Sequence, residues 1–128
     1  MTRIILLLAL LSISCTSQSA DSEGKFTAYG MASISCGEFL EDYARSEITS
    51  EEGDSSFVPF ILTDYVGYVD GAMSTYNEVT TGKSDYFGNP SPKDNMAWIA
   101  SYCRENTKDA FHTAVRLYMA QLIKQHNN

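Results

Sequence analysis

Apolar side chains recur at helical spacing in four separate segments of this chain. In residues 31–46 they follow one another at intervals of three and four, which is the spacing of one face of an α-helix. These positions are Cys36, Phe39, Leu40, Tyr43 and Ala44. The pattern predicts an amphipathic helix over residues 31–46, with its acidic residues on the opposite face.

The second segment begins at Phe57 or Pro59, since proline suits the first position of a helix, and continues to about Val79. Its apolar stripe consists of Phe57, Ile61, Leu62, Tyr65, Val69, Ala72, Met73 and Tyr76. Gly67 and Gly71 lie four residues apart within it. Glycines reduce helix propensity but allow a second helix to approach closely, so we expect a close helix crossing there.

A loop follows at residues 82–90, where Gly, Pro, Asn and Ser are dense. The next helix is predicted from Pro92 to about Glu105, because Ser91 can cap it and Asp94 suits its first turn. One side of it carries Met96, Ile99, Ala100 and Cys103, flanked by Trp98 and Tyr102.

Asn106 or Thr107 is expected to end the third helix and to cap a fourth, with Asp109 in its first turn. The apolar positions of this last helix are Phe111, Ala114, Val115, Tyr118, Met119 and Leu122. Because no segment shows the alternation of a half-buried strand, the predicted fold is all-α, a small single-domain bundle of about four helices.

The N-terminus has the layout of a secretory signal peptide: Arg3, then an apolar run over residues 4–11, then small polar residues. Eight apolar residues are too few to span a bilayer, and no later run is long enough. We expect residues 1–20 to be the signal peptide, residues 21–30 a flexible leader and residues 31–128 the helical domain. The alternative is a lipoprotein signal, in which Cys15 carries the lipid anchor.

The domain is strongly acidic. All 16 Asp and Glu residues but only eight of the nine Lys and Arg residues follow the signal, which leaves a mature net charge of −8. Nucleic acids and anionic lipids require clustered Lys and Arg, and here the cations are scattered singly. A charged partner is therefore expected to be basic.

After signal removal two cysteines remain, Cys36 and Cys103. A zinc site would need four Cys or His ligands in close pairs, and a cysteine nucleophile would need a base and an electropositive pocket. Both cysteines lie on apolar helix faces of an exported chain, which favours a disulfide between them.

No other pattern indicates catalysis or a cofactor. Asp64 and Asp70 do not share a helix face, and His112 stands alone near an apolar face. No glycine-rich phosphate loop and no Gly-x-Ser-x-Gly motif is present. We therefore expect a non-enzymatic protein without a metal or other cofactor.

Taken together, "CGEFLEDY", "FVPFILTDYVGYVDGAMSTYN" and "MAWIASYCREN", followed by an amphipathic helix, resemble the HdeA-like family of small periplasmic helical proteins. The chain is also similar to the Rap and Tai immunity proteins of secretion systems. The resemblance covers residues 36–122 and implies a disulfide between Cys36 and Cys103. Thr107 stands in place of the proline that usually follows the third helix in the family.

The resemblance implies a periplasmic protein that binds other proteins, with homodimers possible. HdeA-like acid chaperones open at low pH and cover apolar surface on clients, whereas an immunity protein would neutralise an exported toxin at neutral pH. The candidate contact surfaces are two loops, residues 47–54 and residues 82–90. The second loop carries Tyr86 and Phe87, which we expect to be exposed.

Overall fold

The structure, a computed structural model, describes residues 29–49, 60–82 and 85–127. It contains four helices in these ranges: α1 (Cys36–Thr49), α2 (Thr63–Val79), α3 (Pro92–Glu105) and α4 (Phe111–His126). Two short 3₁₀ turns, η1 (Gly30–Ser33) and η2 (Phe60–Leu62), precede α1 and α2. No strand occurs among the described residues, and the prediction of an all-α fold with about four helices is confirmed.

Some predicted features lie outside the described residues. These are the signal peptide over residues 1–20, residues 21–28 of the leader, residues 50–54 of the acidic loop, and Phe57. Within the ranges that the structure covers, no helix combines the length and the apolar character that a membrane crossing requires.

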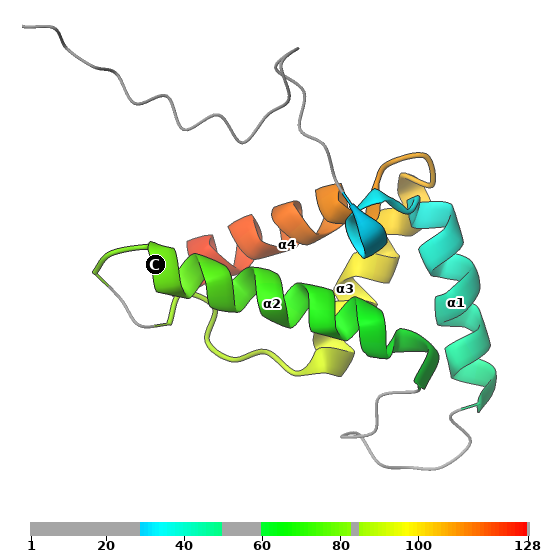
Figure 1. Cartoon of the computed structure of the whole chain (residues 1–128), viewed down its shortest axis with the longest axis horizontal. Helices are drawn as coiled ribbons and strands as arrows, with labels where there is room; N and C mark the ends of the chain where they lie inside the picture. The colour runs from blue at the N-terminus through cyan, green and yellow to red at the C-terminus, as the bar shows by residue number, and fades with distance from the viewer. Residues whose placement is uncertain (1–28, 50–59, 83–84, 128) are drawn as a thin grey trace, which may run out of the picture.

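Helix α3 occupies the centre of the bundle, where it contacts α1, α2 and α4. Figure 1 shows α1 at one end of the molecule, with α2 and α4 extending away from it. The first turn of α2, together with η2, lies against α1.

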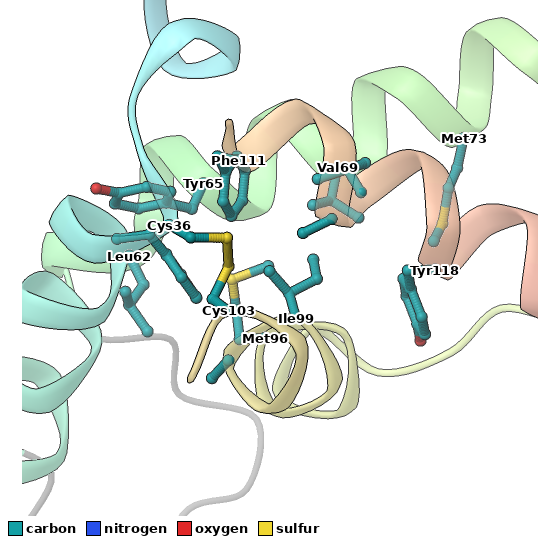
Figure 2. Packing of buried hydrophobic residues seen from close by; sticks show 14 of the residues in the cluster. Cys36, Leu62, Tyr65, Val69, Met73, Met96, Ile99, Cys103, Phe111 and Tyr118 are labelled. Carbon is teal, nitrogen blue, oxygen red and sulfur yellow. A yellow bond between two sulfur atoms is a disulfide. The ribbon is translucent and has the colours of Figure 1, made fainter. Parts of the chain in front are cut away.

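The core is built around aromatic rings and the two cysteines. Phe39, Tyr65 and Phe111 come from three different helices, and their ring centroids lie 4.9–5.1 Å apart. Figure 2 shows Cys36 and Cys103 beside this cluster, with Ile99 and Val69 continuing the core toward Tyr118. Edge-to-face and tilted packing of this kind adds to the stabilisation from apolar burial.

Helix α1 begins later than predicted, at Cys36 rather than at residue 31. The reason is a capping box. The Ser35 backbone N–H donates to the Glu38 carboxylate at 2.8 Å, and the Glu38 N–H donates to the Ser35 hydroxyl at 3.2 Å. These reciprocal bonds satisfy N–H groups that the first turn leaves without partners, and so fix the start of the helix. Further along, the predicted burial of Ala44 is wrong: Ala44 is exposed, while Ser46 is buried.

The predicted close crossing at Gly67 and Gly71 is also wrong. Both glycines are exposed, and a Cβ atom built on either would have no heavy atom within 4 Å beyond its own helix turn. The buried face of α2 is formed instead by Tyr65, Val69 and Met73. The glycines therefore lie on a face of α2 that no described helix covers.

The start of α3 is confirmed, because the Ser91 hydroxyl accepts from the Asp94 N–H at 3.1 Å and Pro92 occupies the first turn. Asn106 ends the helix as expected. Asp109, however, precedes α4 rather than lying in its first turn. Its backbone carbonyl accepts from the Cys36 N–H at 2.7 Å, and this contact holds the α3–α4 turn against the start of α1.

Candidate protein-interaction surfaces

Cys36 and Cys103 form a disulfide with an S–S distance of 2.07 Å, which confirms the predicted pairing. Both residues are fully buried. The bond joins α1 to α3 across 67 positions of sequence. A cross-link of this span stabilises a fold by about 4 kcal/mol in the chain-entropy account. Cys103 is therefore a structural anchor, because its sulfur is held in the disulfide.

Backbone hydrogen bonds reinforce this junction on either side of the disulfide. The Gly37 N–H donates to the Thr107 carbonyl at 3.0 Å, and the Phe111 N–H donates to the Ile34 carbonyl at 2.8 Å. These contacts connect the start of α1 both to the α3–α4 turn and to the start of α4. The three parts of the chain therefore meet beside the disulfide.

His112 is paired within the bundle. Its Nδ1 lies 2.7 Å from the Tyr68 hydroxyl, a contact between α4 and α2. Burial lowers the pKa of His112, and the positive charge of Arg116 lowers it further. Across residues 29–49, 60–82 and 85–127, no three His, Cys, Asp or Glu side chains are grouped so that they could hold a metal ion.

Phe87, which the sequence predicts to be exposed, is 5% exposed and belongs to the core. Its ring packs edge-on against Tyr76 of α2, with centroids 5.4 Å apart. Tyr86 is half-buried and makes a similar contact with Tyr76 at 5.5 Å. The expectation of two exposed aromatic residues is therefore wrong for Phe87 and holds only in part for Tyr86.

The Asp85 side chain holds this loop in place. One carboxylate oxygen accepts from the Phe87 N–H at 2.9 Å and from the Gly88 N–H at 3.3 Å, and Asn77 of α2 donates to the same oxygen at 3.5 Å. Gly88 and Asn89 then have positive φ angles, 72° and 53°, which turn the chain toward α3. An aspartate that bonds the backbone two and three residues ahead pre-forms such a turn. We call residues 85–88 the aromatic loop.

These bonds also control the ionisation of Asp85. The Phe87 N–H is the main cause of a lowered pKa for the carboxyl, and the Gly88 N–H, Asn77 and the charge of His126 act in the same direction. Likewise, the Ser35 N–H lowers the pKa of Glu38 at the start of α1. The pKa shifts of Asp85, Glu38 and His112 all make the folded state more stable at neutral pH than in acid.

The second surface feature is an open groove of about 410 Å³ between α1 and the start of α2. Three half-buried apolar side chains line it, those of Met31, Ile34 and Ile61. It is also lined by four carboxylates, one cation and one phenol: Glu38, Glu41, Asp42, Asp64, Arg45 and Tyr65. We call this feature the acidic groove. It combines apolar contact area with an excess of negative charge.

The four carboxylates of the acidic groove differ in what they bind. Glu38 forms the capping box with Ser35. One oxygen of Asp42 accepts from the Tyr65 hydroxyl at 2.6 Å, and its other oxygen pairs with Arg45. Glu41 and Asp64 are exposed and make no hydrogen bond or ion pair with any residue of the described ranges.

Sequence reasoning predicted the disulfide and named residues 82–90 as a candidate contact surface, but it missed the burial of Phe87 and the acidic groove. The acidic groove depends on residues 31–45 of one segment and residues 61–65 of another, and no spacing rule connects them. For the aromatic loop, the Asp-x-Phe-Gly order of residues 85–88 is a usable signal of an aspartate-capped turn. The candidate acidic loop at residues 47–54 falls outside the side chains that the structure describes.

Comparison of the chain with protein-family models, with characterised proteins and with solved structures finds no significant match to any of them.

Proposed function

We propose that this protein is a non-enzymatic, periplasmic protein-binding domain that acts as an HdeA-like holdase in acid. The observation that carries the proposal is the aromatic loop, in which one ionised carboxylate, Asp85, keeps Phe87 inside the core. The resemblance to the HdeA-like proteins and the disulfide between two buried cysteines suit an exported protein of this kind.

Acid weakens the loop through Asp85. Because its pKa is lowered in the folded state, the unfolded chain binds a proton at a higher pH than the folded chain does. The stability that Asp85 contributes is therefore present above the unfolded pKa of about 3.9 and is lost as pH falls through the lower folded value. Glu38 acts in the same direction at the start of α1.

Release of the aromatic loop would expose apolar surface. Phe87 and Tyr86 both pack on Tyr76, so withdrawal of the loop uncovers that part of α2 and the side chains behind it. At the same time, protonation of all carboxylates near pH 2 changes the charge of the mature chain from −8 to about +11, counting Lys, Arg, both histidines and the amino terminus. A cationic chain with exposed aromatic groups can hold unfolding clients in solution.

The test is binding of the hydrophobic dye ANS, together with light scattering from an acid-labile dehydrogenase, each measured from pH 7 to pH 2. We expect dye binding and suppressed scattering only below about pH 4. In Asp85→Asn, whose side chain is neutral at every pH, dye binding should begin at a less acidic pH. The matched control is Asp70→Asn on the exposed face of α2, which should behave like the wild type. A chain that stays folded and binds no dye at pH 2–3 would rule out this function.

A second function, immunity to an exported toxin at neutral pH, is favoured by the acidic groove. The groove is present in the folded state, and it places Glu41 and Asp64, which pair with no residue of the described ranges, beside apolar side chains. This function predicts tight, saturable binding of one exported protein at pH 7. The test is an affinity column that carries the folded chain at pH 7, loaded with the exported proteins of the source organism. If it retains none of them, this second function is ruled out, and the holdase proposal is unaffected.

A further inference from the structure

The apolar side chains that line the acidic groove are held in place by the fold. Met31 and Ile34 come from the segment before α1, Ile61 comes from η2, and each of these side chains also packs on the core. Figure 1 shows that η1, η2 and α1 lie at one end of the bundle, beside the first turn of α2. The residues that line the groove come from these elements and from α2. Its shape depends on the fold rather than on the rotamer of one surface side chain.

Within the groove, the polar groups divide into two sets. Glu38 and Asp42 are engaged in the fold: Glu38 starts α1, and Asp42 binds Tyr65 and Arg45. A buried tyrosine bonded to Asp42 connects α1 to α2, and burial raises the pKa of this phenol, so that it remains a donor at every physiological pH. Glu41 and Asp64 take no part in these bonds, although they line the same space.

Charge decides what can occupy the groove. Its four carboxylates outnumber its one cation, and the whole chain carries a net charge of −7. An acidic or phosphorylated segment would be repelled, and a second copy of this chain would bring the same excess of negative charge. A purely apolar segment would leave Glu41 and Asp64 partly desolvated without partners. The complementary occupant has cationic and apolar side chains in close succession.

We propose that the acidic groove binds an extended segment of a partner protein in which Lys or Arg alternates with apolar residues. Glu41 on α1 and Asp64 on α2 pair with the cations, while Met31, Ile34 and Ile61 receive the apolar side chains. This proposal deepens the second function above, because it specifies the site and the partner chemistry for binding at neutral pH. It does not require the aromatic loop to open.

The test uses the full chain after signal removal and three fluorescent seven-residue peptides at pH 7 and 150 mM salt. In the first peptide Lys alternates with Leu, in the second Lys alternates with Gly, and in the third Glu alternates with Leu. Fluorescence anisotropy should give saturable binding of the Lys/Leu peptide. Binding of the Lys/Gly peptide should be at least about tenfold weaker, and the Glu/Leu peptide should not bind.

Two double variants separate the groove from the general negative charge of the protein. Glu41→Gln with Asp64→Asn removes the two available carboxylates and should weaken the Lys/Leu peptide at least about tenfold. Asp70→Asn with Glu78→Gln removes two exposed carboxylates of α2 that do not line the groove, and it should change the affinity less than about twofold. Thermal melts at pH 7 verify that both proteins are folded.

Equal weakening by the two double variants would overturn the proposal, since it would indicate diffuse electrostatic attraction. Equal affinity for the Lys/Gly and Lys/Leu peptides, or no binding of the Lys/Leu peptide, would overturn it as well. These outcomes leave the second function open, because an exported partner retained at pH 7 by the Glu41→Gln, Asp64→Asn protein would bind elsewhere on the surface.

Discussion

The Tyr118 hydroxyl of α4 donates a hydrogen bond of 2.7 Å to the side-chain oxygen of Asn95 on α3, and both side chains are buried. This bond crosses the interface between the two helices that form the far end of the core. Because it is shielded from water, each group depends on the other for its hydrogen bond.

We predict that Tyr118→Phe lowers the free energy of unfolding by about 1–3 kcal/mol, since the Asn95 oxygen loses its donor while it remains buried. Urea titration followed by circular dichroism measures the change. Tyr102→Phe is the control, because it removes a hydroxyl that bonds to Asp109 at 2.6 Å nearer the surface, and it should have a smaller effect. Equal losses in the two variants would contradict the special importance of the buried pair.

Reduction of the disulfide is predicted to destabilise the domain by about 4 kcal/mol, because the cross-link restricts the unfolded chain over 67 positions. For a domain of this size the loss corresponds to a decrease of about 15–30 °C in Tm. Differential scanning calorimetry with and without reductant measures it. A Cys36→Ala, Cys103→Ala protein should melt low under both conditions. A reductant-insensitive wild type would indicate that the bond does not form.

The titration of His112 supplies a third prediction. Burial and Arg116 lower its pKa in the folded state, so the stability that neutral His112 contributes is present above about pH 6.5 and is lost as pH falls through the folded pKa. NMR titration of the imidazole should give a lower pKa in the native chain than in urea. Arg116→Gln should raise the native value, whereas Lys124→Gln, two turns further along α4, should leave it unchanged. A native pKa equal to that in urea would exclude the burial argument.

Gly67 and Gly71 offer a stabilising change. Each lies in the interior of α2, is exposed, and has space for a methyl group. Gly67→Ala and Gly71→Ala should each increase the free energy of unfolding by about 0.4–1 kcal/mol, because alanine restricts the unfolded chain and favours the helix. Thermal melts measure this gain in stability. A destabilising effect of Gly67→Ala would indicate that another surface closes on that face of α2.

Gly88 provides the opposite case, since its φ angle of 72° disfavours any residue with a Cβ atom. Gly88→Ala should therefore lower stability by about 1–2 kcal/mol. Thermal melts of the Gly88→Ala protein measure this loss.

The sequence predicted the helical segments well because helix faces follow from spacing alone. Cys36, Phe39, Ile99 and Phe111 are all buried as their positions in the pattern required. Spacing alone fails where tertiary contacts determine which side chains are buried. Ala44 matches the apolar stripe of α1 but is exposed. Gly67 and Gly71 match the pattern of a close helix crossing, but the buried face of α2 is the one that carries Tyr65, Val69 and Met73.

The prediction that Phe87 is exposed fails for another reason. The turn residues of its loop do not reveal that one aromatic side chain packs into the core. The cause is the Asp85 side chain, whose bonds to two backbone N–H groups bend the loop inward. The capping box at Ser35 and Glu38 could have been read from the sequence, because a serine followed three residues later by a glutamate is its usual signature. The acidic groove required the relative position of α1 and α2, which no local pattern contains.

The disulfide between Cys36 and Cys103 also has a kinetic consequence. Residues 36–103 form a closed covalent ring that contains all of α2 and the aromatic loop, while α4 begins just outside it. When the oxidised chain unfolds, the disulfide keeps a contact between α1 and α3 that spans 67 positions of sequence, so the entropy of closing that loop is not lost again on refolding. The ring therefore shortens the conformational search, and the oxidised domain should refold faster than its reduced counterpart.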